Sequence, residues 1–438
     1  MAADSSFLSR RVACRSSTSS RRVNGVPIPD EPVRVALIGA GSRARSIYRP
    51  IMPSMSDWMR VVAVCDPVRE HADALAASYG VPAFYDIREL VRSRPMEAAV
   101  VVTPVESHHS ISCFLSAHGI HNLVETSWCN TVTQARQMIE AARKGKALVR
   151  VAENFFRFPI DRIVAKLAAA EVVGPVHRVV SYADHTGYHN NSRWVAFFGA
   201  HPEWVQSVEH TMPTMAFHES PERFHDSETY RARFFQFPGN GFVMDHLANV
   251  KGFLGRYPRP GYTEWQGERG TIVHFARRGW QGEGEIRLCT DSEFGRRGIA
   301  DTTIPIVTEC PDHRWTRTYA DLRPVGGGVV EYVNPFRPEE IPQHASDWYG
   351  CAIMDHLADF ACAVRGVRPS EFDEQDALMS MMMEVGAKES ALKEGARVRL
   401  PIQGEPESDG RIHAALRARF GVDPLDIEAM LAISYPKP

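Results

Sequence analysis

Apolar runs and amphipathic segments alternate over the first third of the chain. The short, nearly continuous apolar runs predict strands buried on both faces, and the segments between them have helical spacing. The predicted strands are Val33–Ile38, Val61–Cys65, Ala83–Tyr85, Glu97–Thr103, Asn122–Glu125 and Ala147–Ala152, and the predicted helices are Glu70–Tyr79, Ile87–Arg92, Ser110–His118 and Thr131–Lys144. This alternation with short connections predicts an α/β fold, in which residues 31–153 form a doubly wound parallel sheet.

The pattern changes after Asn154. Longer alternating runs, joined by turns such as Gly239-Asn240-Gly241, indicate a large, mainly antiparallel sheet with one open face. Its predicted strands are Val176–Ala183, Tyr230–Phe237, Phe242–Val250, Thr263–Gln266 and Thr271–Phe275, with helices at Ile160–Ala170, Asn191–Phe198, Ser346–Arg365 and Gln375–Lys393. We assign residues 154–402 to this second α/β domain, with Met379–Met383 in its core. Residues 296–345 are rich in proline, glycine and charge, and their elements cannot be ordered.

Two further segments flank these domains. Residues 1–30 are rich in serine and arginine and lack the apolar region of a secretory signal, so we expect a disordered extension. Residues 403–438 form a C-terminal tail with one predicted helix, Arg411–Phe420. The open sheet face of the second domain predicts self-association into a homodimer or homotetramer.

Composition restricts the class of protein further. The 438 residues are 44% hydrophobic and 24% charged with a formal net charge of −3, which is typical of a globular enzyme and provides no field for nucleic acid. No apolar run approaches the roughly 20 residues needed to span a bilayer. The eight cysteines are scattered without a Cys-x-x-Cys pair, which indicates reduced thiols and a cytoplasmic location.

A glycine-rich turn follows the first predicted strand. Gly39 permits a tight turn, Gly41 lets backbone amides approach a diphosphate, and the small Ala44 lets the next helix pack close to the strand. Ser42 and Arg43 lie in the same turn, and we assign all five residues to a dinucleotide site.

An acidic residue ends the second predicted strand at the distance expected for ribose recognition. Asp66 can accept hydrogen bonds from both ribose hydroxyls and would repel a 2′-phosphate, so the predicted cofactor is NAD rather than NADP. Arg69 lies close enough to weaken that preference.

Several further motifs, in order, resemble the glucose–fructose oxidoreductase/inositol dehydrogenase (Gfo/Idh/MocA) family between about residues 33 and 401. They are the Gly39-Ala-Gly41 turn, Cys65-Asp66-Pro67, Thr103-Pro104 with His108, Glu125 at the Glu of the family's Glu-Lys-Pro motif, Glu153-Asn154-Phe-Phe-Arg157, Gly174-Pro-Val and Gly267-Glu-Arg-Gly270-Thr. The resemblance implies an N-terminal Rossmann domain and a C-terminal domain whose open sheet mediates oligomers. It also implies NAD(P)-dependent hydride transfer at a carbinol carbon of a sugar or cyclitol.

The resemblance also implies roles for single residues. It places Glu125 near the nicotinamide, as both a catalytic and a cofactor-binding residue. We assign Thr103, Pro104, His108 and Asn154 to the cofactor crevice as well, with His108 towards the substrate side.

Two motifs depart from the family pattern. The segment Glu125-Thr126-Ser127 lacks the family's catalytic lysine. The family's Asp-x-x-x-His motif corresponds here to His185-Thr-Gly-Tyr188-His189, in which histidine replaces the aspartate. Two of the three usual catalytic groups are therefore changed.

Oxidation of an alcohol requires a group that accepts the hydroxyl proton, and histidine does this near neutral pH. We predict His189 as the base, with His185 or Tyr188 sharing the proton or binding the developing carbonyl oxygen. Arg157 and Arg193 are candidates for holding an anionic substituent of the substrate together with His189, although arginines of this kind more often form surface or interdomain salt bridges. A zinc site would need a third ligand that the sequence does not identify, so no metal is predicted.

The sequence therefore predicts an NAD-dependent carbohydrate oxidoreductase, with two alternatives open. The missing lysine is compatible with a redox-neutral NAD-dependent glycoside hydrolase. Such an enzyme oxidises a sugar carbon, eliminates the aglycone, adds water and then returns the hydride to the sugar. Such an enzyme needs an extra base from the histidine-rich region, to which His210 and His218 could contribute. The other alternative is a non-catalytic dinucleotide-binding sensor.

Overall fold

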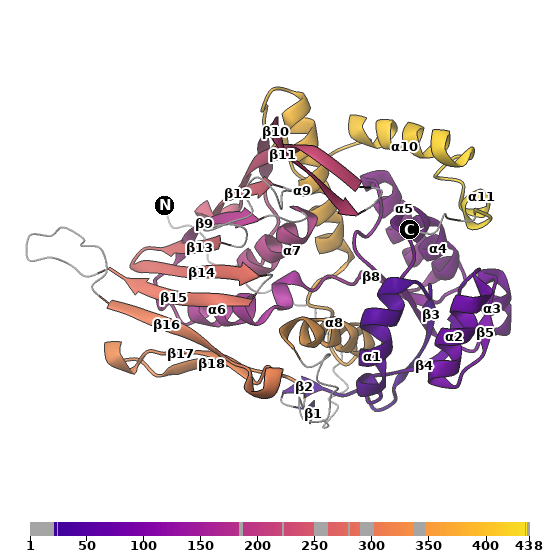
Figure 1. The fold of residues 1–438 in the computed structure, drawn as a ribbon, viewed down its shortest axis with the longest axis horizontal. Coiled ribbons are helices and arrows are strands. Elements are labelled where there is room, and N and C mark those ends of the chain that lie inside the picture. The colour runs from indigo at the N-terminus through magenta and orange to yellow at the C-terminus, as the bar shows by residue number, and fades with distance from the viewer. Residues whose placement is uncertain are drawn as a thin grey trace, which may run out of the picture.

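Two β-sheets organise the structure, a computed structural model that describes residues 22–23, 25–183, 187–220, 223–248, 262–278, 281–289, 302–336, 347–433 and 435 (Figure 1). The N-terminal sheet contains six parallel strands in the order β5-β4-β3-β6-β7-β8. These strands are β3 (Val33–Ile38), β4 (Met59–Cys65), β5 (Ala83–Phe84), β6 (Ala98–Val101), β7 (His121–Val124) and β8 (Val149–Val151). The chain runs outwards from β3 in one direction and then from β6 in the other, which is the strand order of dinucleotide-binding domains. The predicted doubly wound sheet is confirmed.

Helices connect these strands on both sides. A π-helical turn, η1 (Ala44–Tyr48), and the short helix α1 (Arg49–Ile51) follow the glycine turn. The remaining connections are α2 (Arg69–Tyr79), α3 (Ile87–Ser93), α4 (Val105–Ala117) and α5 (Val132–Gly145). Helix α4 begins five residues before the predicted Ser110, because Pro104 lies in extended conformation at its N-cap.

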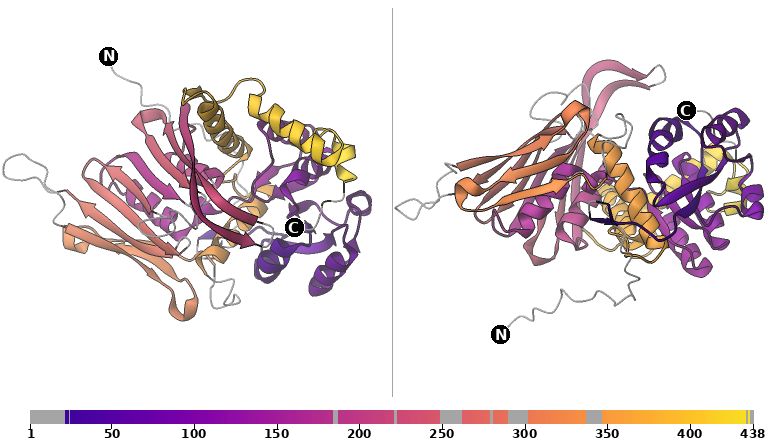
Figure 2. Two further views of the ribbon diagram at one scale, coloured as in Figure 1. Left: turned by 45° about the horizontal axis from the view of Figure 1, so that its top comes forward. Right: turned by 90° about the horizontal axis from the view of Figure 1, so that it is seen from below.

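The second sheet contains eleven strands in the order β18-β17-β16-β15-β14-β13-β9-β12-β11-β10-β19, antiparallel except for the pair β9 and β12. Its strands are β9 (Val176–Ala183), β10 (Trp204–Ser220), β11 (Arg223–Gln236), β12 (Phe242–Ala248), β13 (Tyr262–Gly267), β14 (Gly270–Arg278), β15 (Gln281–Leu288), β16 (Thr302–Glu309), β17 (Arg317–Asp321), β18 (Val329–Val333) and β19 (Val398–Arg399). Helices α6 (Pro159–Ala169), α7 (Gly187–Phe198) and α9 (Glu374–Leu392) pack against one face (Figure 2). The predicted large, mainly antiparallel sheet is therefore confirmed.

The helices that close this domain are buried over most of their length. Helix α8 (Trp348–Val364) buries thirteen residues, and α9 places Met379, Met381, Met382 and Met383 in the core. The prediction that Met379–Met383 are mostly packing residues is thus confirmed. Trp265 and Phe235 are fully buried on the inner face of the sheet and pack within the same core.

Three parts of the chain differ from the sequence prediction. Residues 1–21 and 24 of the expected disordered extension lie outside the described residues, and its described part includes a hairpin, β1 (Arg22–Val23) and β2 (Val26–Pro27), that buries Val23. The stretch left unordered at 296–345 supplies β16, β17 and β18 at one edge of the large sheet. His185 and the last two residues of the predicted strand Phe242–Val250 lie outside the described residues.

The C-terminal segment packs back onto the first domain. In α10 (Glu407–Phe420), the Asp409 carboxylate accepts hydrogen bonds from the backbone amide and hydroxyl of Thr133 at 2.8 Å and so caps α5. Arg419 pairs with Glu106 at 2.7 Å, and α11 (Ile427–Leu431) contacts α4. The predicted tail is therefore an ordered connection between the two domains. Among the described helices, none combines the length and apolar composition that a membrane span requires.

Candidate active site

A cavity of about 480 Å³ lies at the carboxyl ends of the parallel strands, where open α/β sheets bind ligands. It is lined by Arg43, Val102, Thr103, Glu125, Thr126, Asn154, Phe155, His189, Trp348 and Tyr349. The residues from Arg43 to Phe155 follow the strands β3, β6, β7 and β8. His189 comes from α7, and Trp348 and Tyr349 come from α8. Five residues that the sequence analysis proposed for a site lie in this lining: Arg43, Thr103, Glu125, Asn154 and His189.

The glycine turn is shaped for a ligand at its outer side. Gly39 has a φ of +96°, and a Cβ there would lie 2.4 Å from the carbonyl oxygen of Val102, so only glycine fits. A Cβ on Gly41 would meet no atom within 4 Å, which leaves open space in front of the turn. Ala44 is fully buried against the strand, as expected for close packing. These features fit the diphosphate of an adenine dinucleotide.

The Asp66 carboxylate stabilises the glycine turn through hydrogen bonds. It accepts hydrogen bonds from the Ala40 amide at 2.7 Å and the Val68 amide at 2.8 Å. Each carboxylate oxygen retains a second lone pair, so the side chain can still accept from a ribose hydroxyl.

Glu125 lies at the end of β7 and receives donors on both oxygens. Arg43 Nε at 2.7 Å and the Tyr48 hydroxyl at 2.8 Å donate to Oε1, while the Thr126 amide at 2.9 Å donates to Oε2. Burial alone would raise the pKa of the Glu125 carboxyl, but the charge and hydrogen bond of Arg43 outweigh it and hold this pKa below its ordinary value. Arg43 also donates to the Tyr349 hydroxyl at 2.6 Å, which links the glycine turn to α8.

Removing the positive charge of Arg43 should destabilise the protein in a pH-dependent way. Because the folded-state pKa of Glu125 is depressed, the stability gained from the pair is present at neutral pH and is lost as the pH falls through that pKa. We expect Arg43→Met to lower the free energy of unfolding at neutral pH by about 1–2 kcal/mol, since water screens the partly exposed guanidinium. The melting temperature of Arg43→Met should therefore lie below that of the wild type at neutral pH, and the two should converge as the pH is lowered.

Arg143→Met is the control, because Arg143 pairs with Glu140 at the surface and little change is expected. If Arg43→Met melts like the wild type at neutral pH, the Arg43–Glu125 pair does not contribute to stability.

His189 is held by a buried carboxylate. Its Nδ1 lies 3.0 and 2.9 Å from the two carboxylate oxygens of Glu153, which is 1% exposed. The imidazole also stacks on Phe155, with ring centroids 4.1 Å apart and an interplanar angle of 8°. Nδ1–H donates to Glu153, so Nε2 carries the lone pair and makes no hydrogen bond to the described residues. A carboxylate-oriented imidazole with a lone pair at a cavity is the arrangement of a general base.

Tyr188 and His108 were also predicted as site residues, but neither lines the cavity. Tyr188 is buried behind it, and burial raises the pKa of its phenol well above the ordinary value. The ring of His108 is buried between the carbonyl oxygens of Thr103 and Ser127, at 2.8 and 3.0 Å. Its place is thus in the wall behind the site.

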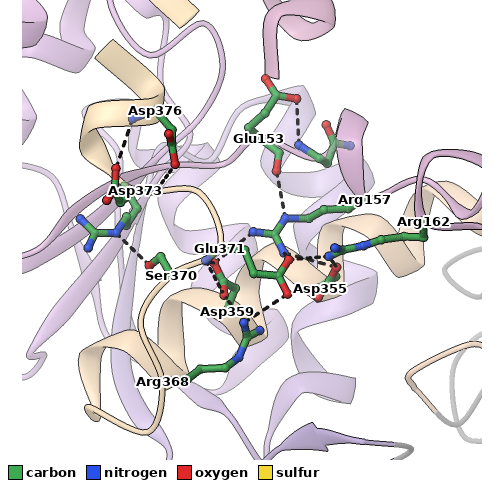
Figure 3. Close-up of polar contacts among 12 residues, drawn as sticks. Glu153, Arg157, Arg162, Asp355, Asp359, Arg368, Ser370, Glu371, Asp373 and Asp376 are labelled. Carbon is green, nitrogen blue, oxygen red and sulfur yellow. Dashed lines mark hydrogen bonds and ion pairs between the residues drawn. The ribbon is translucent and has the colours of Figure 1, made fainter. Parts of the chain in front are cut away.

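The two arginines proposed for substrate binding are paired with carboxylates inside the protein. Arg157 is 3% exposed and lies within 3.3 Å of Asp355, Asp359 and Glu371 (Figure 3). Arg193 is 1% exposed and donates to Asp161 at 2.8 Å. Neither arginine lines the cavity, and carboxylates hold both guanidinium groups, so the structure favours the salt-bridge alternative for both.

The remaining histidine candidates contribute nothing to this lining. His210 and His218 are exposed on β10, and His185 is not among the described residues. In the part of the chain that the structure describes, no group of three His, Cys, Asp or Glu side chains is arranged to hold a metal ion.

Three residues in or behind the lining were not predicted as site residues: Glu153, Trp348 and Tyr349. Glu153 directly follows a predicted strand, the same signal that identified Glu125, and that signal could have identified it as a site residue. Trp348 and Tyr349 begin a helix some 200 residues further along the chain, and their apolar pattern predicts only core packing. Only the fold brings them to the cavity.

Comparisons with known proteins agree with this architecture. Residues 33–153 match the family model described as an oxidoreductase family with an NAD-binding Rossmann fold. A D-glucoside 3-dehydrogenase of Escherichia coli is 34% identical over 133 residues, which are 30% of this chain and 37% of that protein. A D-apiose dehydrogenase of Paraburkholderia graminis is 24% identical over 143 residues, 32% of this chain and 37% of that protein. The alignments thus span little more than a third of each curated relative.

A solved structure resembles nearly the whole chain. Levoglucosan dehydrogenase, in complex with NADH and levoglucosan, superposes with a TM-score of 0.61 at 17% identity, covering 85% of this chain and all of that one. At this level of identity the likeness establishes the fold of both domains.

Proposed function

We propose that this protein is an NAD-dependent carbohydrate oxidoreductase, because residues 33–153 match the model of the Gfo/Idh/MocA oxidoreductase family with an NAD-binding Rossmann fold. The proposed substrate is a ring carbinol of a sugar, glycoside or cyclitol, which becomes a carbonyl. Asp66 favours NAD over NADP, because its carboxylate suits a ribose diol and repels a 2′-phosphate.

The observation that carries this proposal is the His189–Glu153 pair at the cavity. His189 Nε2 would accept the proton of the substrate hydroxyl, and the Glu153 carboxylate would stabilise the imidazolium that results. Bound NAD supplies the hydride acceptor. The glycine turn would hold its diphosphate through backbone amides, while Thr103 and Glu125 would line the nicotinamide half.

Two features support a carbohydrate substrate. The cavity combines aromatic walls at Phe155, Trp348 and Tyr349 with a few polar groups, which suits a small polyol with an apolar ring face. The relatives are named for a D-glucoside, D-apiose and levoglucosan, all of which are carbohydrates.

The redox-neutral glycosidase is less well supported. Its elimination step needs a second base for the α-proton. Among the described lining residues the only carboxylate is Glu125, which already accepts hydrogen bonds on both oxygens from Arg43, Tyr48 and Thr126. Net dehydrogenation requires only His189.

Incubation of the protein with NAD and a panel of sugars, glycosides and cyclitols tests the proposal. We expect reduced cofactor to accumulate in proportion to the oxidised sugar. Aglycone release without net reduced cofactor would instead identify a glycosidase. Cofactor binding without conversion of any panel member would identify a sensor.

A further inference from the structure

Asn154 lines the cavity and carries a buried side-chain amide nitrogen that makes no hydrogen bond within the described protein. The residue is 2% exposed and lines the cavity, and its Nδ2 has no hydrogen-bond partner among the described residues. Leaving a buried amide donor without a hydrogen-bond partner is unfavourable. A donor of this kind in a ligand cavity indicates an acceptor on the ligand.

The backbone of Asn154 is fixed at both ends. Its amide donates to Glu153 Oε1 at 2.9 Å, and its carbonyl accepts from the Arg157 amide at 3.1 Å. Arg157 is in turn anchored to α8 by Asp355 and Asp359 (Figure 3). The side-chain amide is therefore presented from a rigid turn.

This turn also holds the proposed base. Asn154 stands between Glu153, which binds His189 Nδ1, and Phe155, on which the imidazole stacks. It follows β8, which is three strands away from β3 and its glycine turn. At about 4.8 Å between strands, that separation is roughly 14 Å. The amide thus belongs to the substrate half of the site and not to the diphosphate half.

We infer that Asn154 Nδ2–H donates a hydrogen bond to the reacting oxygen of the substrate, beside His189. This inference rests on the proposed function and replaces the cofactor-binding role expected for Asn154 from the sequence. Arg43, the cation in the lining, is committed to Glu125 and Tyr349, and position 126 is a threonine. Asn154 Nδ2 is the buried polar atom of the described lining that has no hydrogen-bond partner in the protein.

The chemistry balances in one step. The substrate O–H bond breaks and its proton moves to His189 Nε2, while the carbinol C–H electron pair leaves with the hydrogen for the nicotinamide. The C=O bond forms, and its oxygen carries more negative charge in the transition state than in the alcohol. A hydrogen bond from Asn154 that strengthens at this point lowers the barrier.

Asn154→Asp tests the inference, because it keeps the shape of the side chain and removes the N–H donor. We expect kcat to fall about 100-fold, as for the loss of one oxyanion donor, while the Kd for NADH stays within about twofold. Asn154→Ala gives a second variant should the aspartate perturb folding. Asn130→Ala is the matched control, since the Asn130 amide donates to the Val105 carbonyl outside the lining.

The outcomes separate the alternatives. Unchanged kcat with a tenfold weaker NADH affinity would return Asn154 to the cofactor, and no change in either quantity would overturn the inference as well. Wild-type turnover is measured first, so failure of the proposed function is seen independently of the variants. A wild type that binds NADH but oxidises no sugar would remove both proposals.

Discussion

Replacement of His189 by alanine is expected to lower kcat about 100- to 10,000-fold while the affinity for NADH stays within about twofold. The His189 imidazole lines the cavity, Glu153 holds its Nδ1 and Phe155 holds its ring face, which leaves Nε2 as the nitrogen for a substrate proton. Steady-state kinetics on the best substrate of the panel, with NADH binding followed by fluorescence, measures both quantities.

His177→Ala is the matched control. His177 lies on β9, pairs with Glu268 at 3.0 Å and has a side chain that is 45% exposed, so turnover should not change. Normal turnover of the His189→Ala protein would remove His189 from its role as base. Loss of NADH binding in that variant would instead indicate a structural or cofactor-binding role.

Gly41→Val is expected to weaken NADH binding at least 100-fold, about 2.7 kcal/mol, with little change in melting temperature. A Cβ at Gly41 would meet no protein atom within 4 Å, so a valine there should disturb the fold little. It would instead occupy the space through which backbone amides approach the diphosphate. Calorimetry with NADH and thermal unfolding of the same samples separates the two effects.

Gly410→Ala serves as the control, because Gly410 in α10 also has open space around its Cβ position and lies far along the chain from the glycine turn. Gly39→Ala should behave differently from both. Its Cβ would clash with the Val102 carbonyl, so it should lose the fold. NADH binding by Gly41→Val at wild-type affinity would contradict the placement of the diphosphate at this turn.

Local patterns were sufficient to predict the first domain. Each of its strands is short, apolar and bounded by turn residues, and the spacing from Gly39 to Asp66 reflects a single strand–helix–strand unit. The mainly antiparallel pairing of the second sheet was predicted, but its number of strands was not. Strands β16–β18 bury only Ile304, Ile306, Thr318 and Ala320, so each gives at most a short alternating signal.

The site was predictable where it depends on strand ends. Thr103, Glu125 and Asn154 follow three parallel strands, and the topology brings strand ends of this kind to one edge of the sheet. His189 was identified by its chemistry, whereas its partner Glu153 was noticed only as part of a motif. The burial of Arg157 and Arg193 could not be predicted. The sequence does not show that each guanidinium group is already paired with a buried carboxylate.

Tracing deuterium tests the central claim most directly. A substrate from the panel, deuterated at its ring carbinol carbons, is incubated with the protein and NAD. The deuterium content of the reduced cofactor is then measured by mass spectrometry. Direct hydride transfer in this cavity predicts one deuterium in each reduced nicotinamide. Conversion of the sugar with no deuterium in the cofactor would contradict the account.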